Sequence, residues 1–240
     1  MLAAKPETDK AVEFADERRR AAMRDAAMSF AMQSGLVRRY FELGGILERY
    51  ARQLDRVYRF DRLMIAQAGF TVAPPVVVET TAAFRVGERG RRAASARRVL
   101  RIALPARVVS GSPGWRGYFE RAWETPRRPS AVLFPRTAEE EALWAGWIRE
   151  GWTEGTRLAE DAFLADLDRL NRDFEGIVTW RILEAQRMVS APEIAVEAHA
   201  VVGGGKEMRV KERAIRITDD ARLNPLAGDW RVIEETPWPQ

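Results

Sequence analysis

A long helical pattern is the feature that most constrains how this chain can fold. From 137 to about 189, apolar residues recur at helical spacing, and Pro192 ends the pattern. It opens with Thr137-Ala138-Glu139-Glu140, a capping-box sequence in which a hydroxyl and a carboxylate satisfy free backbone N–H groups. We therefore expect one long helical segment. Gly176 is its weakest point, since an interior glycine costs about 1 kcal/mol relative to alanine.

A second helical pattern occupies the N-terminal part of the chain, from 11 to about 58. Gly35 and the pair Gly44-Gly45 interrupt it, and the pattern therefore predicts two helices rather than one. We interpret residues 1–10 as a disordered lead-in.

Alternation of apolar and polar residues predicts strands in two further regions. In the first, about 72–110, two β-type runs follow Pro74-Pro75 and are joined by an arginine-rich loop. In the second, about 194–218, Gly203-Gly204-Gly205 makes a turn, and Lys211-Glu212-Arg213 is expected to make another.

The predicted fold class is α+β. The strands of 72–110 and 194–218 are expected to form a sheet, flanked by the N-terminal helices and by the long helical segment 137–189. A chain of this length can bury a core without disulfides. We therefore expect a single domain over residues 11–235, followed by a tail at 236–240.

The residue inventory leaves little material for catalysis. The chain has no cysteine and one histidine, which excludes disulfides and a cysteine nucleophile and argues against a transition-metal site. His199 could serve as the base of a hydrolase, but no nucleophile motif accompanies it, and we prefer an ordinary strand histidine. The sequence therefore predicts no enzyme, no catalytic residue, no cofactor and no metal.

An arginine-rich segment between 85 and 101 offers two interpretations. Its many arginines suit a nucleic-acid interface, although Phe84 is the only aromatic residue near it that could stack on bases. The segment equally suits a solvated loop or a surface that docks another protein. We favour docking, with Arg91, Arg92, Arg97 and Arg98 as candidate interface residues, and keep nucleic-acid binding as the alternative.

Tryptophan is abundant in this chain, with eight residues. Three of them, Trp144, Trp147 and Trp152, crowd one part of the long helical pattern. Tryptophan is enriched both in cores and in interface hot spots, so these three are also candidate interface residues.

Spaced motifs in the C-terminal half give the chain a family resemblance. They include Gly151-Trp152 with Gly155, Arg169 with Asp173, Gln186, and Met208-Arg209. In this order they resemble the DotC family of Dot/Icm type IVB secretion systems and the related TraI lipoprotein of IncI-type conjugation systems. The resemblance extends over nearly the whole chain from about Arg19.

The resemblance implies a structural, non-catalytic subunit of an outer-membrane core complex. Members of the family are periplasmic lipoproteins that join DotD-like and DotH-like proteins in a hetero-oligomeric ring and support placement of the secretin-like component. The lipobox cysteine of the family is missing here. We accordingly expect a periplasmic, outer-membrane-associated protein whose lipid anchor is absent from this chain.

Overall fold

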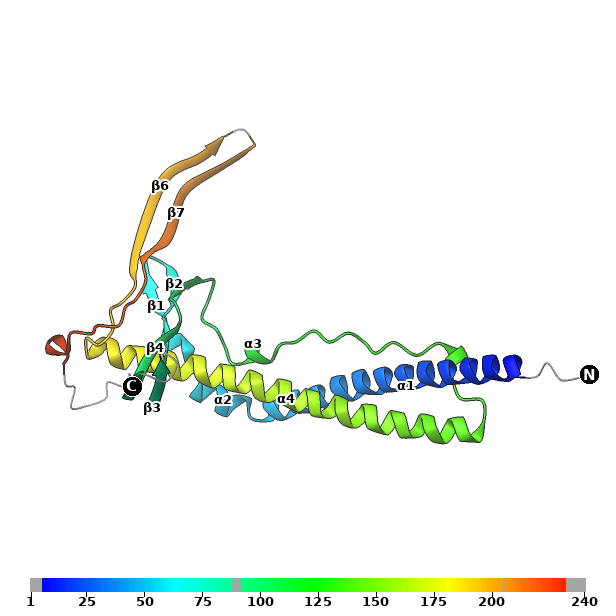
Figure 1. The fold of residues 1–240 in the computed structure, drawn as a ribbon. Helices are drawn as coiled ribbons and strands as arrows, with labels where there is room; N and C mark the ends of the chain where they lie inside the picture. Colours follow the sequence, from blue (N-terminus) through cyan, green and yellow to red (C-terminus); the bar gives the residue numbers. More distant parts are fainter. Residues whose placement is uncertain (1–5, 88–91, 205, 232–240) are drawn as a thin grey trace, which may run out of the picture. The chain divides into compact units, whose positions relative to one another are not determined.

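The computed structural model describes residues 6–87, 92–204 and 206–231, and it confirms the α+β class (Figure 1). The helices are α1 (Pro6–Arg49), α2 (Ala51–Val57), α3 (Arg116–Phe119) and α4 (Ala138–Ala185). The strands are β1 (Ile65–Gln67), β2 (Phe70–Ala73), β3 (Val76–Gly87), β4 (Arg92–Leu104), β5 (Arg107–Val109), β6 (Glu193–Gly204) and β7 (Glu207–Asp219).

Internal contacts divide the chain into two compact units. Unit 1 comprises Met1–Arg52 and Phe119–Leu167, and unit 2 comprises Gln53–Tyr118 and Asp168–Gln240. The division is finer than the single domain expected over 11–235. Because α4 runs from one unit into the other, its two halves serve different cores.

Two stripes of small residues build the core of unit 1. On α1 the stripe is Ala27, Ala31 and Gly35, and on α4 it is Gly151, Gly155 and Ala159. Both stripes have the four-residue spacing that aligns side chains on one helix face, and all of their members are buried. A Cβ added at Gly151 would lie 2.6 Å from the Met28 carbonyl oxygen, so the two backbones approach closely.

The paired helices of unit 1 run in the same direction. Gly151 faces Met28, and Gly155, one turn later, faces Met32. Further along, Arg39 pairs with Glu160 at 2.7 Å. Residue numbers therefore increase in the same direction along α1 and the first half of α4, so the two helices are parallel.

The predicted interruption of the N-terminal helix is wrong in position. α1 continues through Gly35 and the Gly44-Gly45 pair and ends at Arg49. Gly35 is a packing residue, because a Cβ there would lie 2.7 Å from the Trp152 carbonyl oxygen. α1 also begins at Pro6, inside the expected lead-in, and proline is favourable in a first helical turn. Residues 1–5 and 236–240 lie outside the described part of the chain.

The second half of α4 carries the core of unit 2. Trp180 and Leu183 are buried there with Val77 of β3, and with Val189 and Ala221 from the segments beyond the helix. No break occurs at Gly176, whose missing side chain makes room for Val76 and the Val77 backbone.

The long helix ends at Ala185, earlier than the expected 189. Arg187 takes a left-handed conformation with φ 59°. The Met188 N–H then bonds to the Leu183 carbonyl at 2.8 Å, and the Arg187 N–H to the Glu184 carbonyl at 2.9 Å. This pattern is a Schellman cap, which terminates helices.

The strands form three small antiparallel sheets rather than the one sheet expected. Their orders are β1-β2-β5, β3-β4 and β6-β7. Prolines explain part of the division, because a proline cannot donate to a ladder. Pro74-Pro75 separates β2 from β3, and Pro105 lies in the two-residue connection between β4 and β5.

Two predicted loops are strands instead. β3 and β4 extend through most of the arginine-rich segment, and only 88–91 falls between them, outside the described residues. β7 likewise runs through Lys211-Glu212-Arg213, where a turn was expected. Lys211 has φ 57°, a left-handed backbone conformation that is common in turns, but the strand continues through it. Among the described residues, no helix is both long and apolar enough to cross a bilayer.

Candidate functional site

Asp166 is a buried carboxylate that organises unit 1. Its side chain accepts two hydrogen bonds from Arg121, at 2.7 and 2.6 Å, and lies 2.9 Å from the Tyr40 hydroxyl. Burial, reinforced by the hydrogen bond to Asp166, raises the pKa of Tyr40 to about 12. The Trp123 ring stands edge-on to Tyr40 at 5.4 Å. The cluster ties the segment after Phe119 to both long helices of the unit.

Asp173 holds a second cluster, in unit 2. Its carboxylate accepts a hydrogen bond from the Tyr118 hydroxyl at 3.1 Å and bonds from Arg172 at 2.9 and 2.7 Å. Arg169 donates to the Tyr118 carbonyl at 2.7 Å and lies 5.4 Å from the centre of its ring. Burial, followed by the charge of Asp173, raises the pKa of Tyr118. The motif residues Arg169 and Asp173 thus meet around Tyr118.

The remaining motif residues do not join this cluster. Gly151 and Gly155 belong to the helix pair of unit 1. The carbonyl of Gln186 accepts a hydrogen bond from the Arg231 backbone at 2.8 Å. Met208 is 65% exposed on β7, and the side chain of Arg209 lies outside the described part of the structure.

The three candidate tryptophans occupy different surroundings. Trp144 meets Phe134 edge-on at 5.8 Å, and Trp147 is half-buried beside a groove lined by Arg19 and Glu140. Trp152 is 42% exposed and is the member of the three best placed to contact a partner.

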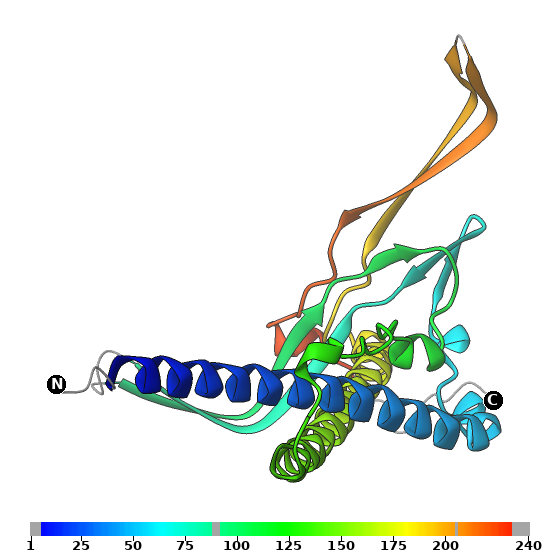
Figure 2. The same cartoon turned by 90° about the vertical axis from the view of Figure 1, so that its right-hand side faces the viewer.

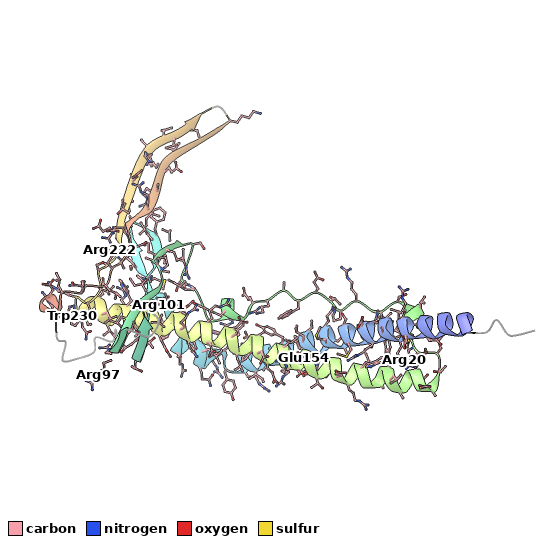
Figure 3. All side chains as sticks on the ribbon, in the orientation of Figure 1. Arg20, Arg97, Arg101, Glu154, Arg222 and Trp230 are labelled. Atoms are coloured by element: carbon pink, nitrogen blue, oxygen red, sulfur yellow. The ribbon has the colours of Figure 1, made fainter. Side chains whose placement is uncertain are left out.

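One arginine of the arginine-rich segment pairs with a carboxylate of the neighbouring strand β3. Arg98 binds both oxygens of Glu79, at 2.5 and 2.8 Å, and holds the pKa of that carboxyl below its usual range. Arg97 is exposed, and Figure 3 labels it with Arg101 on β4. Arg91 and the side chain of Arg92 lie outside the described residues. Nucleic-acid binding by this segment stays a prediction.

The outer half of the β6–β7 hairpin exposes a group of apolar side chains, of which only Met208 belongs to the sequence motifs. Val201 and Val210 are cross-strand partners, 57% and 59% exposed, and Met208 lies on their face. Every residue of β6 from Glu197 onward is exposed. In Figures 1 and 2 this half extends beyond the small β1-β2-β5 sheet of the same unit. Alternation of apolar and polar residues in a strand predicts that the apolar face is covered. The exposure of the apolar face of this hairpin is therefore visible only in the structure.

His199 lies on the same hairpin. Its Nε2 is 3.7 Å from a carboxylate oxygen of Glu197, and the side chain is exposed. Within the ranges described, no group of three or more histidines and carboxylates is placed to hold a metal ion.

These features define a class: an α+β protein with two helix-based units, carboxylate clusters occupied by their own arginines, and an exposed β-hairpin. Residues 17–232 match the family model for the TraI component of type IV secretory systems, described as conjugal DNA-protein transfer. The chain belongs to this family. None of the curated proteins compared with it matches.

Proposed function

We propose that the chain is a structural, non-catalytic subunit of the outer-membrane core complex of a type IVB secretion or conjugation machine. In this proposal it resides in the periplasm and assembles with DotD-like and DotH-like proteins. Membership of the type IV secretion family over residues 17–232 is the observation that carries it. The ordered DotC-like motifs support the more specific assignment to the outer-membrane core complex.

The exposed apolar side chains support a role in assembly. Single exposed apolar residues are ordinary on protein surfaces, but clusters indicate binding sites. Val201, Met208 and Val210 form such a cluster on one face of the hairpin. The Asp166 and Asp173 carboxylates are already engaged by arginines, which suits fixing the fold better than proton transfer.

The direct test is fractionation of donor cells that carry the complete secretion locus. We expect a tagged chain to co-fractionate with the outer membrane and to co-purify with the DotH-like protein. Deleting its gene should abolish transfer, and complementation should restore it. A chain that stays monomeric in the cytosol of such cells would sink the proposal.

A histidine variant tests the non-catalytic part of the proposal. We expect His199→Ala to complement the deletion fully, because the imidazole is exposed and lies 3.7 Å from the carboxylate of Glu197. The measurement is transfer frequency at matched protein level. Loss of transfer with the assembly intact would indicate chemistry at His199. A variant with Val201→Asp and Val210→Asp is the contrasting case, expected to fold and fail to assemble.

A further inference from the structure

The outer half of the β6–β7 hairpin lacks the packing that normally supports a two-stranded ribbon. Such ribbons are marginal in water unless a further strand or a helix covers them. From Glu197 to Gly204, all of β6 is exposed. Among the described residues, β7 is the strand that pairs with β6, which leaves the opposite edge of β6 open.

The two edges of the hairpin differ in their chemistry. Natural sheets protect open edges with charged residues or proline. β7 follows this rule, because most residues from Glu207 to Arg213 are charged. β6 breaks it, since the stretch from Ala198 to Gly204 contains no lysine, arginine, aspartate, glutamate or proline. The unprotected edge is therefore the one suited to receive another strand.

The residues around this edge indicate the chemistry of the incoming strand. On one face lie the apolar side chains of Val201, Met208 and Val210. The opposite face of β6 has Ala198, Ala200 and the 37% exposed Val202, and Ala198 and Val202 pair with Arg213 and Arg209 of β7. Across the outer part of β7, basic residues outnumber acidic ones. A complementary strand has apolar side chains on the first face and acidic ones on the second.

We infer that the outer edge of β6, from Ala198 to Val202, docks an extended segment of a partner protein in which apolar and acidic residues alternate. Backbone hydrogen bonds to the edge supply affinity, and the two faces supply selectivity. The inference rests on the proposed function, because an assembly subunit is what needs such an edge.

A second copy of this chain fits the edge less well. A β6–β6 pair would bring no carboxylate to the second face, because the stretch from Ala198 to Gly204 contains no acidic residue. An acidic segment of a different protein supplies carboxylates to that face.

The test uses the purified full chain and a fluorescent peptide of ~10 residues, enough for a strand, in which valine and glutamate alternate. A peptide of alternating valine and lysine is the control. We expect anisotropy to detect binding of the first peptide and little of the second. Hydrogen exchange should slow in residues 197–204 of β6 more than in β7 when the first peptide binds.

A pair of variants at one exposed position separates charge from folding. Ala200→Glu should raise the dissociation constant of the valine–glutamate peptide roughly tenfold, because the new carboxylate repels the glutamates of the peptide. Ala200→Lys has a side chain of similar length and should not weaken it. Unchanged circular dichroism and melting temperature verify that both variants fold.

Several results would overturn the inference. They are no binding of the valine–glutamate peptide, equal losses in both Ala200 variants, or protection confined to β7.

Binding to phosphatidylserine vesicles instead, lost in Ala200→Glu, would assign the edge to lipid. Dimerisation in sedimentation experiments, lost in the same variant, would assign it to a second copy. Peptide failure alongside normal outer-membrane fractionation removes only this inference. Peptide binding by a cytosolic monomer removes only the proposed function.

Discussion

Asp166 illustrates how a buried charge fixes the path of an irregular segment. The residue is 1% exposed, and a charge in such a place must be paired to be tolerated. Arg121 supplies both hydrogen bonds of a fork and Tyr40 contributes a third partner. The residues between Phe119 and the 3-10 turn at Ala131–Leu133 have no regular structure of their own, so this pairing anchors where they start.

Removing that carboxylate tests its role. We expect Asp166→Ala to lower the free energy of unfolding by roughly 2–4 kcal/mol, because Arg121 and Tyr40 lose their common partner. The Arg121 side chain is 38% exposed, which keeps the loss below that of a fully buried pair. Asp161→Ala on the same helix is the matched control. Its partner Arg157 is exposed, and the expected loss is under about 1 kcal/mol. Urea unfolding measures both, and equal losses would contradict the assignment.

Alkaline pH provides a second test at the same cluster. Burial raises the pKa of Tyr40 from 10.0 to about 12, so the folded chain holds this proton more tightly than the unfolded chain. The resulting stabilisation is complete below pH 10 and is lost as pH rises from 10 toward 12. We therefore expect Tyr40→Phe to melt with a shallower pH dependence across that window. Tyr50→Phe controls for the loss of an exposed phenol. An unchanged slope in Tyr40→Phe would count against the cluster.

At the scale of elements, helical glycines have two opposite effects on stability in this chain. Gly155 lets the Met32 backbone approach α4, whereas Gly146 on the same helix has nothing near the position of a side chain. The sequence shows both as glycine within a helical pattern. Which one packs depends on the partner helix, which is far away along the chain.

A pair of alanine substitutions distinguishes the glycine that is needed for helix packing from the one that is not. We expect Gly155→Ala to destabilise the protein by about 1–3 kcal/mol, because the added methyl group meets backbone that cannot move aside. Gly146→Ala should stabilise it by about 0.5–1 kcal/mol, because alanine lowers the entropy of the unfolded chain and favours the helix. Thermal unfolding measures both. The same sign in both variants would refute this account of the helix pair.

The sequence predicts what depends on local pattern and misses what depends on distant partners. The predicted helix start is confirmed: the Glu140 N–H bonds to Thr137 Oγ1 at 3.2 Å, and α4 begins at Ala138. The reciprocal half of the capping box differs, because the Glu140 carboxylate accepts from the Arg136 N–H at 2.7 Å rather than from that of Thr137. Strands also form in both regions where alternation predicts them. The interruption at Gly35 fails because a close helix neighbour is invisible to periodicity. The division into three sheets and the cluster at Asp166 likewise depend on contacts between remote segments.

At the scale of the whole molecule, the chain builds two cores that share α4. The core of unit 1 lies along the small-residue stripes, and the core of unit 2 surrounds Trp180. Local opening of a protein follows such cooperative groups of contacts. The two cores should therefore respond separately to damage in one of them.

Native-state hydrogen exchange tests this separation. In Gly155→Ala we expect amides around Ala27 and Ala31 of α1 to exchange faster, because their packing surface is disturbed. Amides of β3 near Val77 should keep their wild-type rates, since they belong to the other core. Gly176→Ala should show the reverse pattern, because that glycine seats Val76 and Val77. Uniform acceleration in both variants would mean a single cooperative core.

The parallel pairing of α1 with α4 also dictates an order of events during synthesis. Neither unit is a continuous stretch of chain: residues 53–118 are made between the two halves of unit 1. When α1 leaves the ribosome, the surface that receives Ala27, Ala31 and Gly35 does not yet exist. Pairing has to wait for Gly151 and Gly155, and such distant contacts slow folding. The core of unit 1 therefore cannot close until the chain has been synthesised to about residue 167.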